Sequence, residues 1–390
     1  MKNLYVRLSK VTSTVCIAAV SCTVSAQEPE LPPVAVPGKG ALVSSEHIFD
    51  VTNKPTKESH ASTIVETPTG LVAAWFAGTR ERDLDVGILM SRHDGERWSD
   101  PVEVVNGVQS STLRYPTWNP VLFQPADGPL MLFYKVGPHP RTWWGMLTTS
   151  DDDGATWSWP TKLGDAYAVG HLLGPVKNKP VQLEDGTIIC PSSTEIEYDD
   201  GTSAWRVHFE VSRDSGKSWE VIGPIHNGKT FHAIQPSILT YADGRMQVLC
   251  RSREKRIVQS WSEDGGKTWS GLSETSLPNP NSGTDAVTLK DGRQLLIYNH
   301  TEGIIKQDDG PILKPRRMLN LAISSDGEHW KPVMTLEHET GEHPQDEERR
   351  RHFGEYSYPA IIQTADGMVH LTYTWNREGV KHAVVDPQKL

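Results

Sequence analysis

The sequence predicts an all-β fold, a six-bladed β-propeller whose ring is closed by a strand from the N-terminal end. Three observations predict it: a turn motif that recurs along the chain, a hairpin pattern that occurs six times, and a strand-like segment at 41–50. Regular recurrence of this kind is typical of propellers, in which each repeat forms one antiparallel sheet, or blade.

The turn motif reads Ser-x-Asp-x-Gly-x-Thr/Ser-Trp. Three copies are complete, at 150–157, 212–219 and 262–269, and two degenerate copies lie at 91–98 and 324–330. The terminal tryptophans, at 98, 157, 219, 269 and 330, are therefore 59, 62, 50 and 61 residues apart. Ser and Asp side chains hydrogen-bond backbone amides within tight turns, and Gly permits a positive φ. We interpret the motif as a structural element of each blade.

The hairpin pattern is an apolar run, a turn and a second apolar run. Asp-Gly pairs that begin at 127, 185, 243, 291 and 366 mark five of the turns, and the first blade has the weaker STIVETPTGLVAAWF. A third strand follows each hairpin, for example at 86–90, 205–211 and 318–323, and the fourth usually follows the tryptophan. The last copy ends near residue 386 without a fourth strand, so we expect 41–50 to supply it.

Residues 1–26 have the pattern of a cleaved signal peptide, with a basic start, an apolar stretch and a small-residue exit. A lipoprotein acylated at Cys22 is the alternative. Residues 27–40 are Pro-rich and are expected to form a tail, and 41–390 a single propeller domain. We therefore expect a secreted or periplasmic protein whose mature chain has no membrane span.

Two cysteines, Cys190 and Cys250, remain after the predicted signal peptide. Each ends an apolar run, so we expect buried free thiols, with one disulfide as the alternative that an oxidising compartment permits.

The charge balance argues against nucleic acid as a partner. The chain has 39 basic and 49 acidic residues, a net charge of −10, and no basic stripe of the kind that duplex binding requires. No HExxH or similar spacing occurs, so neither a metal nor another cofactor is expected. The 13 Trp against 7 Phe fit repeated packing units and sugar-stacking platforms. The oligomeric state stays open.

The spacing around the hairpins predicts a polar ring at one mouth of the central channel. Residues eight before and eight after each Asp of the Asp-Gly pairs return to the end of the hairpin opposite its turn. They are Asn119 and Lys135, Lys177 and Ser193, Gln235 and Arg251, Gly283 and Asn299, and Tyr358 and Thr374. Blade one contributes His60 and the acidic loop 79–85. Because the strands between these positions are apolar, the ring is typical of a site for a hydrophilic ligand, which we expect to be a glycan.

Further residues are expected around the same mouth. The loop after blade two offers Trp143 and Trp144 as a sugar-stacking platform with the guanidinium of Arg141. Lys179 is expected on the same strand face as Lys177, and weaker candidates are Glu195, His208 and His300.

The chain resembles the bacterial sialidases, and more closely the BNR-repeat group often labelled exo-α-sialidase. The resemblance rests on the turn motif, the six hairpins and the segments LPNPNSGTDAVTLKDGR and YSYPAIIQTADG, and it covers residues 45–388. It implies a six-bladed propeller. It also implies a site in which three arginines bind a carboxylate, a Glu activates a Tyr nucleophile, and an Asp is the acid/base.

Carried over residue by residue, the resemblance places the nucleophile at Tyr358, with Tyr356 as a neighbour on the same strand face. The second arginine falls at Arg251, and the third at Arg316 or Arg317. The chain departs from the pattern at two positions, because the first arginine falls at His60 and the activating Glu at Gln235. An acid/base is expected from the loop 79–85, as Glu81, Asp83 or Asp85.

Three functions follow from these residues. The first is an exo-acting glycoside hydrolase on a terminal acidic or unusual sugar, with Tyr358 as nucleophile or stabiliser and Glu81 or Asp85 as acid. Its anionic group would be bound by Arg251, Arg316 and Lys177, and other contacts would come from Gln235, Asn119, Tyr356, Arg141, Trp143 and Trp144. The second is a polysaccharide lyase on uronate glycans, in which His60 or Tyr358 removes a proton and Arg and Lys neutralise the carboxylate. The third is a carbohydrate-binding propeller without turnover.

Overall fold

The computed structural model describes residues 31–390 except 168, 171–172, 304–314 and 342–343. Residues Leu31–Leu390 form one compact unit. The predicted signal peptide and the first residues of the predicted tail lie outside the described residues.

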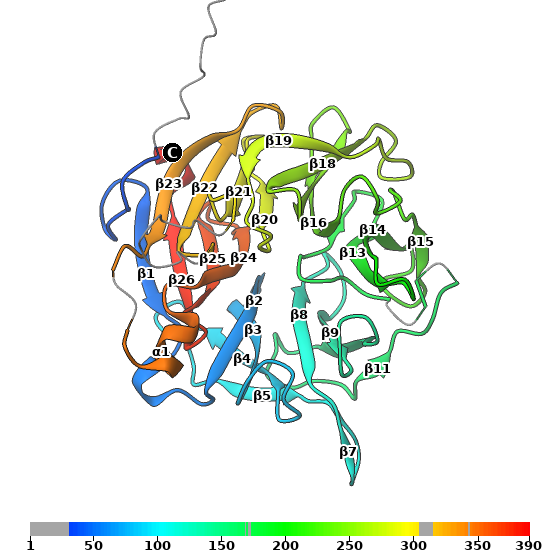
Figure 1. Cartoon of the computed structure of the whole chain (residues 1–390), viewed down its shortest axis with the longest axis horizontal. Coiled ribbons are helices and arrows are strands. Elements are labelled where there is room, and N and C mark those ends of the chain that lie inside the picture. Colours follow the sequence, from blue (N-terminus) through cyan, green and yellow to red (C-terminus); the bar gives the residue numbers. More distant parts are fainter. Residues whose placement is uncertain (1–30, 168, 171–172, 304–314, 342–343) are drawn as a thin grey trace, which may run out of the picture. The chain divides into compact units, whose positions relative to one another are not determined.

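Six four-stranded antiparallel sheets follow one another around a ring (Figure 1). Blades one to three are β2 (Glu58–Thr67), β3 (Gly70–Gly78), β4 (Gly87–His93) and β5 (Val102–Val105); β8 (Thr117–Phe123), β9 (Leu130–Val136), β10 (Trp144–Ser150) and β11 (Thr161–Lys162); and β12 (Val181–Gln182), β13 (Ile188–Glu197), β14 (Ser203–Ser212) and β15 (Glu220–Ile222). Blades four to six are β16 (Ala233–Thr240), β17 (Met246–Ser252), β18 (Arg256–Ser262) and β19 (Ser273–Pro278); β20 (Asp285–Thr288), β21 (Gln294–Tyr298), β22 (Met318–Ser324) and β23 (Lys331–His338); and β24 (Tyr356–Gln363), β25 (Val369–Trp375) and β26 (Gly379–Val385), completed by β1 (Leu42–His47).

The ring is closed as predicted. Strand β1 pairs antiparallel with β26, with Ser45 opposite Ala383, so the N-terminal strand is the outer strand of the last blade. Figure 1 shows β1, in blue, beside β26, in red. The six-bladed propeller predicted from the hairpins and the turn motif is confirmed.

The turn motif has the structural role expected of it. In the copy at 150–157, the Ser150 hydroxyl donates to Asp152 Oδ1 over 2.7 Å and accepts the backbone N–H of Gly154 over 2.8 Å. Asp152 in turn accepts the backbone N–H and the hydroxyl of Thr156. The copies at 212–219 and 262–269 repeat these bonds, so the carboxylate holds the turn that precedes each fourth strand.

The core lies between adjacent blades. One cluster joins blades five and six through side chains such as Leu295, Leu321, Ile361 and Leu371, all of which are buried. Cys190 and Cys250 are buried free thiols, as expected, and the alternative of a disulfide between them is wrong.

Several short segments lie outside the blades. Residues 32–35 run along blade five, where Ala35 N donates to Thr335 O over 2.8 Å and the Thr335 hydroxyl donates to Pro32 O over 2.7 Å. A small hairpin, β6 (Val108–Ser110) with β7 (Leu113–Arg114), separates blades one and two, and helix α1 (Glu347–His352) precedes β24. Two 3-10 turns, η1 (Val51–Asn53) and η2 (Pro387–Lys389), complete the elements. Within the described residues, no helix is both long and apolar enough for a membrane span.

A bulge recurs in the first strand of the blades, at the end opposite the hairpin turn. The strand register breaks in β2, β8, β16 and β24, and a residue with positive φ lies at each break: Ala61, Asn119, Gln235 and Tyr358. Lys177, at the corresponding position of blade three, also has a positive φ, of 75°. A bulge redirects the side chain that it carries. Here it brings residues of separate blades together, because a Cβ atom on Gly283 would lie within 3.5 Å of Gln235, Lys177 and Tyr358.

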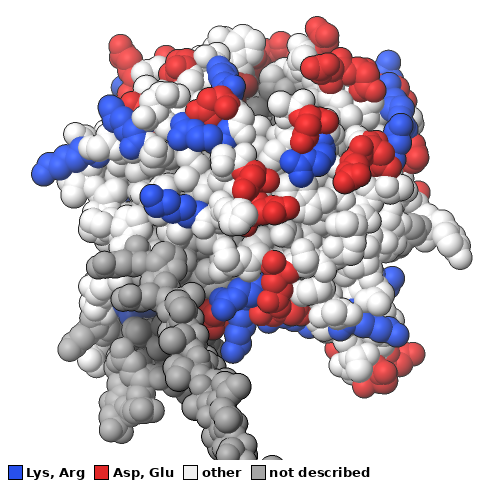
Figure 2. Space-filling model, turned by 90° about the horizontal axis from the view of Figure 1, so that it is seen from above, with Lys and Arg blue, Asp and Glu red and all other residues white. Residues whose placement is uncertain are grey.

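The surface carries charges of both signs. Figure 2 shows Lys and Arg interspersed with Asp and Glu over the described part of the face in view, without a continuous basic patch on it.

Candidate functional site

Tyr358 lies on the bulge of β24, with φ of 49°. Its hydroxyl accepts a hydrogen bond of 2.8 Å from Arg251 Nη1 on β17, and one of 3.3 Å from Gln235 Nε2 on β16. Gln235 Oε1 also accepts from Arg251 Nη1 over 3.3 Å. The phenol, the amide and the guanidinium therefore form one connected group contributed by blades four and six.

Two guanidiniums flank the phenol ring. The Arg251 and Arg316 Cζ atoms lie 5.9 and 5.5 Å from the centre of the Tyr358 ring. Asn281 connects the two arginines, because its Oδ1 accepts from Arg251 Nε over 2.7 Å and its backbone oxygen accepts from Arg316 Nη2 over 3.5 Å. Arg317 is buried and donates to Gly341 O over 2.7 Å, so the structure assigns Arg316, not Arg317, to the mouth.

A network of ion pairs continues from Arg316 toward blade one. Glu355 accepts from Arg316 Nη1 over 3.1 Å, from Arg377 Nε over 3.2 Å and from His352 Nδ1 over 3.0 Å. Arg377 also pairs with Glu81. Although burial raises the pKa of the Glu355 carboxyl, the charges of Arg377, His352 and Arg316 outweigh it and hold that pKa well below its usual value. Burial alone would lower the pKa of His352, but its contacts with Glu355 and Glu58 raise that pKa above its usual value.

The acidic loop 79–85 is mostly engaged in this network and in its own turn. The Asp85 carboxylate is exposed and accepts the N–H and the hydroxyl of Thr79, over 2.9 and 2.8 Å. Glu81 is bound to the Arg377 guanidinium and keeps one third of its side chain exposed. Of the three acids predicted from this loop, Glu81 is therefore the one that contacts the ion-pair network.

A different carboxyl group lies on the other side of Arg251. Glu195, on β13, is directly opposite Trp205 on β14, and the Arg251 Cζ atom lies 5.3 Å from the centre of the Trp205 ring. Arg253 stacks on the same ring at 3.9 Å. Burial raises the pKa of Glu195 above its usual value in spite of the opposing charges of Arg251 and Arg253. Glu195 lines a cavity of about 540 Å³ together with His139, Arg141, Thr142, Val169, Thr194, Ile196, Glu197, Arg206 and Pro224.

Comparison with known proteins places this propeller in a family. The model of the BNR repeat-like domain matches residues 69–371, which is most of the chain. The chain belongs to the BNR repeat-like domain family. No curated protein matches its sequence.

Solved structures share the fold of this BNR repeat-like protein at low sequence identity. A Hadza microbial sialidase is 16% identical, with a TM-score of 0.69 over 89% of this chain and 69% of its own. A protein of unknown function from Dyadobacter fermentans is 15% identical, with a TM-score of 0.67 over 88% and 98% of the two chains. The intramolecular trans-sialidase from Ruminococcus gnavus, solved with oseltamivir carboxylate, is 15% identical, with a TM-score of 0.62 over 90% and 99%. These likenesses identify a sialidase-like propeller.

In blade one, the residue with positive φ lies one position after the ring position that the spacing predicted. In β2 of this BNR repeat-like protein the bulge falls at Ala61, whereas His60 precedes it. His60 is buried and packs against Tyr358 at 4.3 Å between ring centres, while its Nδ1 shares a hydrogen bond of 2.9 Å with the Thr374 hydroxyl. Burial, reinforced by the charge of Arg377, holds the pKa of His60 well below its usual value, so the imidazole is neutral.

Several polar residues of the predicted ring bind the backbone instead of facing an open mouth. Lys177 is buried, and its ammonium donates to Thr284 O over 2.7 Å, to Asn178 Oδ1 over 2.8 Å and to Pro359 O. Lys135 donates to Leu173 O and Gly174 O, and Asn299 to Met318 O and Tyr356 O. Lys177 was expected to bind an anionic group, but its contacts tie blade three to blades five and six.

The predicted stacking platform is not formed by its two tryptophans. Trp143 is 4% exposed and packs on Trp118 within an apolar cluster, and Trp144 packs edge-on against Tyr115. Arg141 of the same loop is exposed and pairs with Glu197, at the cavity that Glu195 lines. Of these three residues, only Arg141 is exposed to a ligand, whereas the indole rings of Trp143 and Trp144 pack against other aromatic side chains.

Two further predicted contacts are buried. Asn119 carries the bulge of β8 and is 6% exposed. Tyr356 is 5% exposed and belongs to the core between blades five and six. The bulge at 357–360 separates it from Tyr358, so the expectation that both tyrosines share a strand face is wrong.

Asn281, Glu355 and Arg377 were not predicted from the sequence as site residues, although the positions of Glu355 and Arg377 beside the strands of blade six could have indicated them. Glu355 directly precedes the strand of the predicted nucleophile, and Arg377 lies in the turn between the second and third strands of blade six. In blade one the corresponding turn is the acidic loop 79–85, which the prediction did include.

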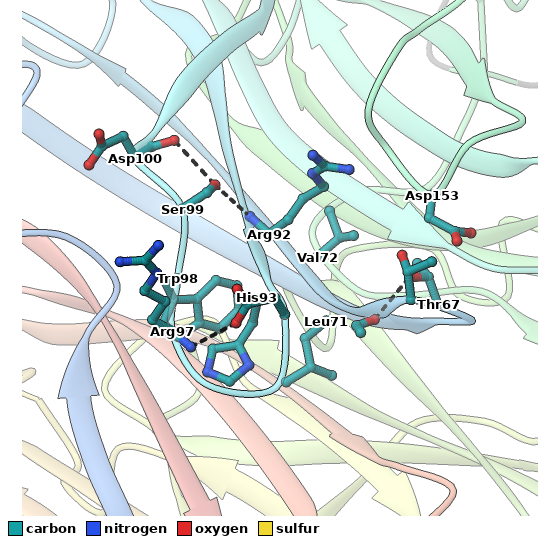
Figure 3. Close-up of a pocket in the computed structure, with 13 residues that line it drawn as sticks. Thr67, Leu71, Val72, Arg92, His93, Arg97, Trp98, Ser99, Asp100 and Asp153 are labelled. Carbon is teal, nitrogen blue, oxygen red and sulfur yellow. Dashed lines mark hydrogen bonds between the residues drawn. The ribbon is translucent and has the colours of Figure 1, made fainter.

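Another cavity lies at the opposite end of blade one. Figure 3 shows Thr67, Leu71, Arg92, Trp98 and Asp153 around it, beside the β2–β3 turn and the degenerate turn motif. Residues 62–67 of β2 separate this turn from the bulge at Ala61, and the residues that line the cavity do not include Tyr358, so the cavity is distinct from the Tyr358 site.

Proposed function

We propose that this protein is a sialidase-like exo-glycoside hydrolase that acts on a terminal acidic sugar of a glycan. The observation that carries the proposal is the Tyr358 hydroxyl held by Arg251 at the mouth, with Arg316 beside the same ring. Two guanidiniums provide the planar, charged donors that bind a carboxylate well. A phenol oxygen between them is positioned to stabilise the positive charge that develops at the anomeric carbon.

The sugar differs from the one that an unmodified sialidase pattern would select. His60 stands where the first arginine is expected, and its neutral ring lies against Tyr358. Arg377 is the nearest guanidinium on that side, but Glu355 and Glu81 bind it. An anionic group would therefore be bound by Arg251 and Arg316. This favours an acidic sugar that is not sialic acid, or sialic acid bound in a different way.

A lyase acting on uronate glycans is the second candidate. The contact of a neutral His60 with Tyr358 favours it, because proton removal next to a carboxylate needs a neutral base beside cationic groups. Its product would be an unsaturated uronate, which a hydrolase cannot form. A secreted or periplasmic location, in which glycans are accessible, belongs to the same proposal.

A product assay tests the two candidates. The purified protein is incubated with sialylated, uronate-bearing and rhamnose-bearing glycans, and reducing ends, free sialic acid and absorbance at about 235 nm are followed together. New reducing ends without absorbance, lost in Tyr358→Phe, support the hydrolase. Absorbance supports the lyase. Binding of a glycan without any product would contradict both and leave a carbohydrate-binding propeller.

A further inference from the structure

The proposed hydrolase needs a carboxylic acid that is protonated when the substrate binds, next to the site at Tyr358. Two of the residues predicted for this role are already bound to other groups of the protein. Asp85 is exposed and accepts two hydrogen bonds from Thr79, and Glu81 is bound to the Arg377 guanidinium. A carboxyl group on another element, Glu195 of β13, is the alternative to the loop 79–85.

A chain of contacts connects Glu195 to the Tyr358 site. Its strand neighbour is Trp205, on whose ring Arg251 and Arg253 lie, and Arg251 donates to the Tyr358 hydroxyl. Glu195 also lines the cavity of about 540 Å³ described above. For Glu195 to act on a sugar held by Arg251, the leaving group of that sugar would extend toward this cavity.

We propose that Glu195 is the residue that protonates the glycosidic oxygen, an inference that rests on the proposed hydrolase activity. The proton of the Glu195 carboxyl passes to that oxygen as its bond to the anomeric carbon breaks, and the aglycone leaves as an alcohol. Water then adds to the anomeric carbon and returns a proton to the Glu195 carboxylate. The net reaction consumes one water and leaves the enzyme unchanged.

The charged groups around Glu195 agree with this role. The charges of Arg251, Arg253 and Arg141 act on Glu195, and the cavity is also lined by Arg206, His139 and the acidic Glu197. Burial outweighs these cations and keeps the pKa of Glu195 above its usual value, so the acid form persists to higher pH than in an ordinary Glu. The cations would stabilise the carboxylate that remains after proton transfer.

The test compares two leaving groups on the sugar that the product assay identifies. An alkyl aglycone needs protonation, whereas a 4-nitrophenyl aglycone leaves without it. For Glu195→Gln we expect kcat/KM to fall about 10²- to 10⁴-fold for the alkyl glycoside and far less for the nitrophenyl glycoside. The alkaline limb of the pH profile should disappear with the alkyl substrate. Glu220→Gln, at an exposed ion pair of the same blade, is the control that should leave both rates unchanged.

Each other outcome contradicts the inference. An equal loss on both substrates would give Glu195 a structural role, which a melting curve of the variant would reveal. The same leaving-group dependence in Glu81→Gln, with Glu195→Gln active, would assign the acid to the loop 79–85. Tyr358→Phe separates the two proposals. If Tyr358→Phe is inactive and Glu195→Gln is fully active, the role of Glu195 as the acid is refuted while the proposed hydrolase activity stands. Absence of product from every glycan removes the hydrolase and this inference together.

Discussion

The Arg251 guanidinium donates a hydrogen bond of 2.8 Å to the Tyr358 hydroxyl and so connects blade four to blade six across the mouth of the channel. Gln235, in the position where sialidases are expected to carry the activating Glu, completes the group through its amide. Because an amide cannot accept the phenol proton as a carboxylate can, the site depends on its cations more than a site with a Glu there would.

Tyr358→Phe removes the hydroxyl and retains the ring between the two arginines. We expect the activity identified by the product assay to fall at least about 10²-fold, since the variant lacks the oxygen that we propose to stabilise the transition state. The fold should persist, because the ring contacts with His60 and Arg316 remain. The measurement is kcat and KM together with a melting curve. Undiminished kcat would show that the phenol oxygen takes no part in the reaction.

Arg251→Lys keeps a positive charge but loses the planar fork that reaches Tyr358 and Asn281 together. We expect kcat/KM to fall about 10- to 100-fold, as for the loss of a charge-assisted hydrogen bond of roughly 1.5–3 kcal/mol. Arg213→Lys is the control, because Arg213 is exposed and pairs only at the surface with Glu220. An Arg251→Lys variant with undiminished kcat/KM would argue that Arg251 acts through its charge alone and not through its planar contacts.

Glu355→Gln breaks the buried network at the carboxylate that holds Arg316, Arg377 and His352. Because these cations keep the pKa of Glu355 well below its unfolded value, its contribution to stability is present above that unfolded value and is lost as the pH falls through the folded one. We expect the variant to lose about 3–5 kcal/mol of unfolding free energy at neutral pH. The difference from the parent protein should shrink progressively in acid.

Denaturant titrations at neutral and acidic pH measure this difference. Glu220→Gln, which breaks an exposed ion pair with Arg213, should cost about 0–1 kcal/mol at either pH. A Glu355→Gln deficit that does not depend on pH would show that the carboxylate is held by packing instead of by its charge.

Lys177→Met preserves the length of the side chain but removes the donor to Thr284 O and Pro359 O. Two buried carbonyl groups then lack that partner, so we expect the unfolding free energy to fall by about 2–4 kcal/mol. The melting temperature should decrease, while KM for the glycan stays within a few-fold of the parent. A raised KM at an unchanged melting temperature would restore the sequence prediction that Lys177 binds the substrate.

The contrast between Lys177 and Arg251 shows what the sequence could predict. Both occupy ring positions of the hairpin repeat, but Arg251 contacts the Tyr358 hydroxyl whereas Lys177 is buried against backbone carbonyls. Spacing cannot reveal whether a long polar side chain turns to the ligand or to a neighbouring carbonyl, because that depends on the bulges and on contacts between blades. The fold was predictable because the turn motif and the hairpins are local patterns that repeat.

The other errors of the sequence prediction have the same cause. Arg377, Glu355 and Asn281 lie in segments between strands, for which the hairpin repeat gives no spacing. They join the site through the guanidiniums of Arg316 and Arg251, contacts that the spacing cannot reveal. Trp143 looked like an exposed platform in the sequence, but the structure places it against Trp118 in an apolar cluster. Tyr356 was placed on the wrong face because one bulge reverses the alternation of the strand.

Ring closure can be tested within a single strand. In β1, Leu42 is 2% exposed in the core of the last blades, whereas its neighbour Val43 is 44% exposed. We expect Leu42→Ala to lower the unfolding free energy by about 2–4 kcal/mol, as for a large-to-small change in a core. Val43→Ala should change it by less than about 0.5 kcal/mol. Deletion of residues 31–50 should lower the unfolding free energy more than Leu42→Ala does. It should also promote aggregation, since β26 would become an unpaired edge strand. A soluble, fully stable deletion variant would contradict the role of β1 in closing the propeller.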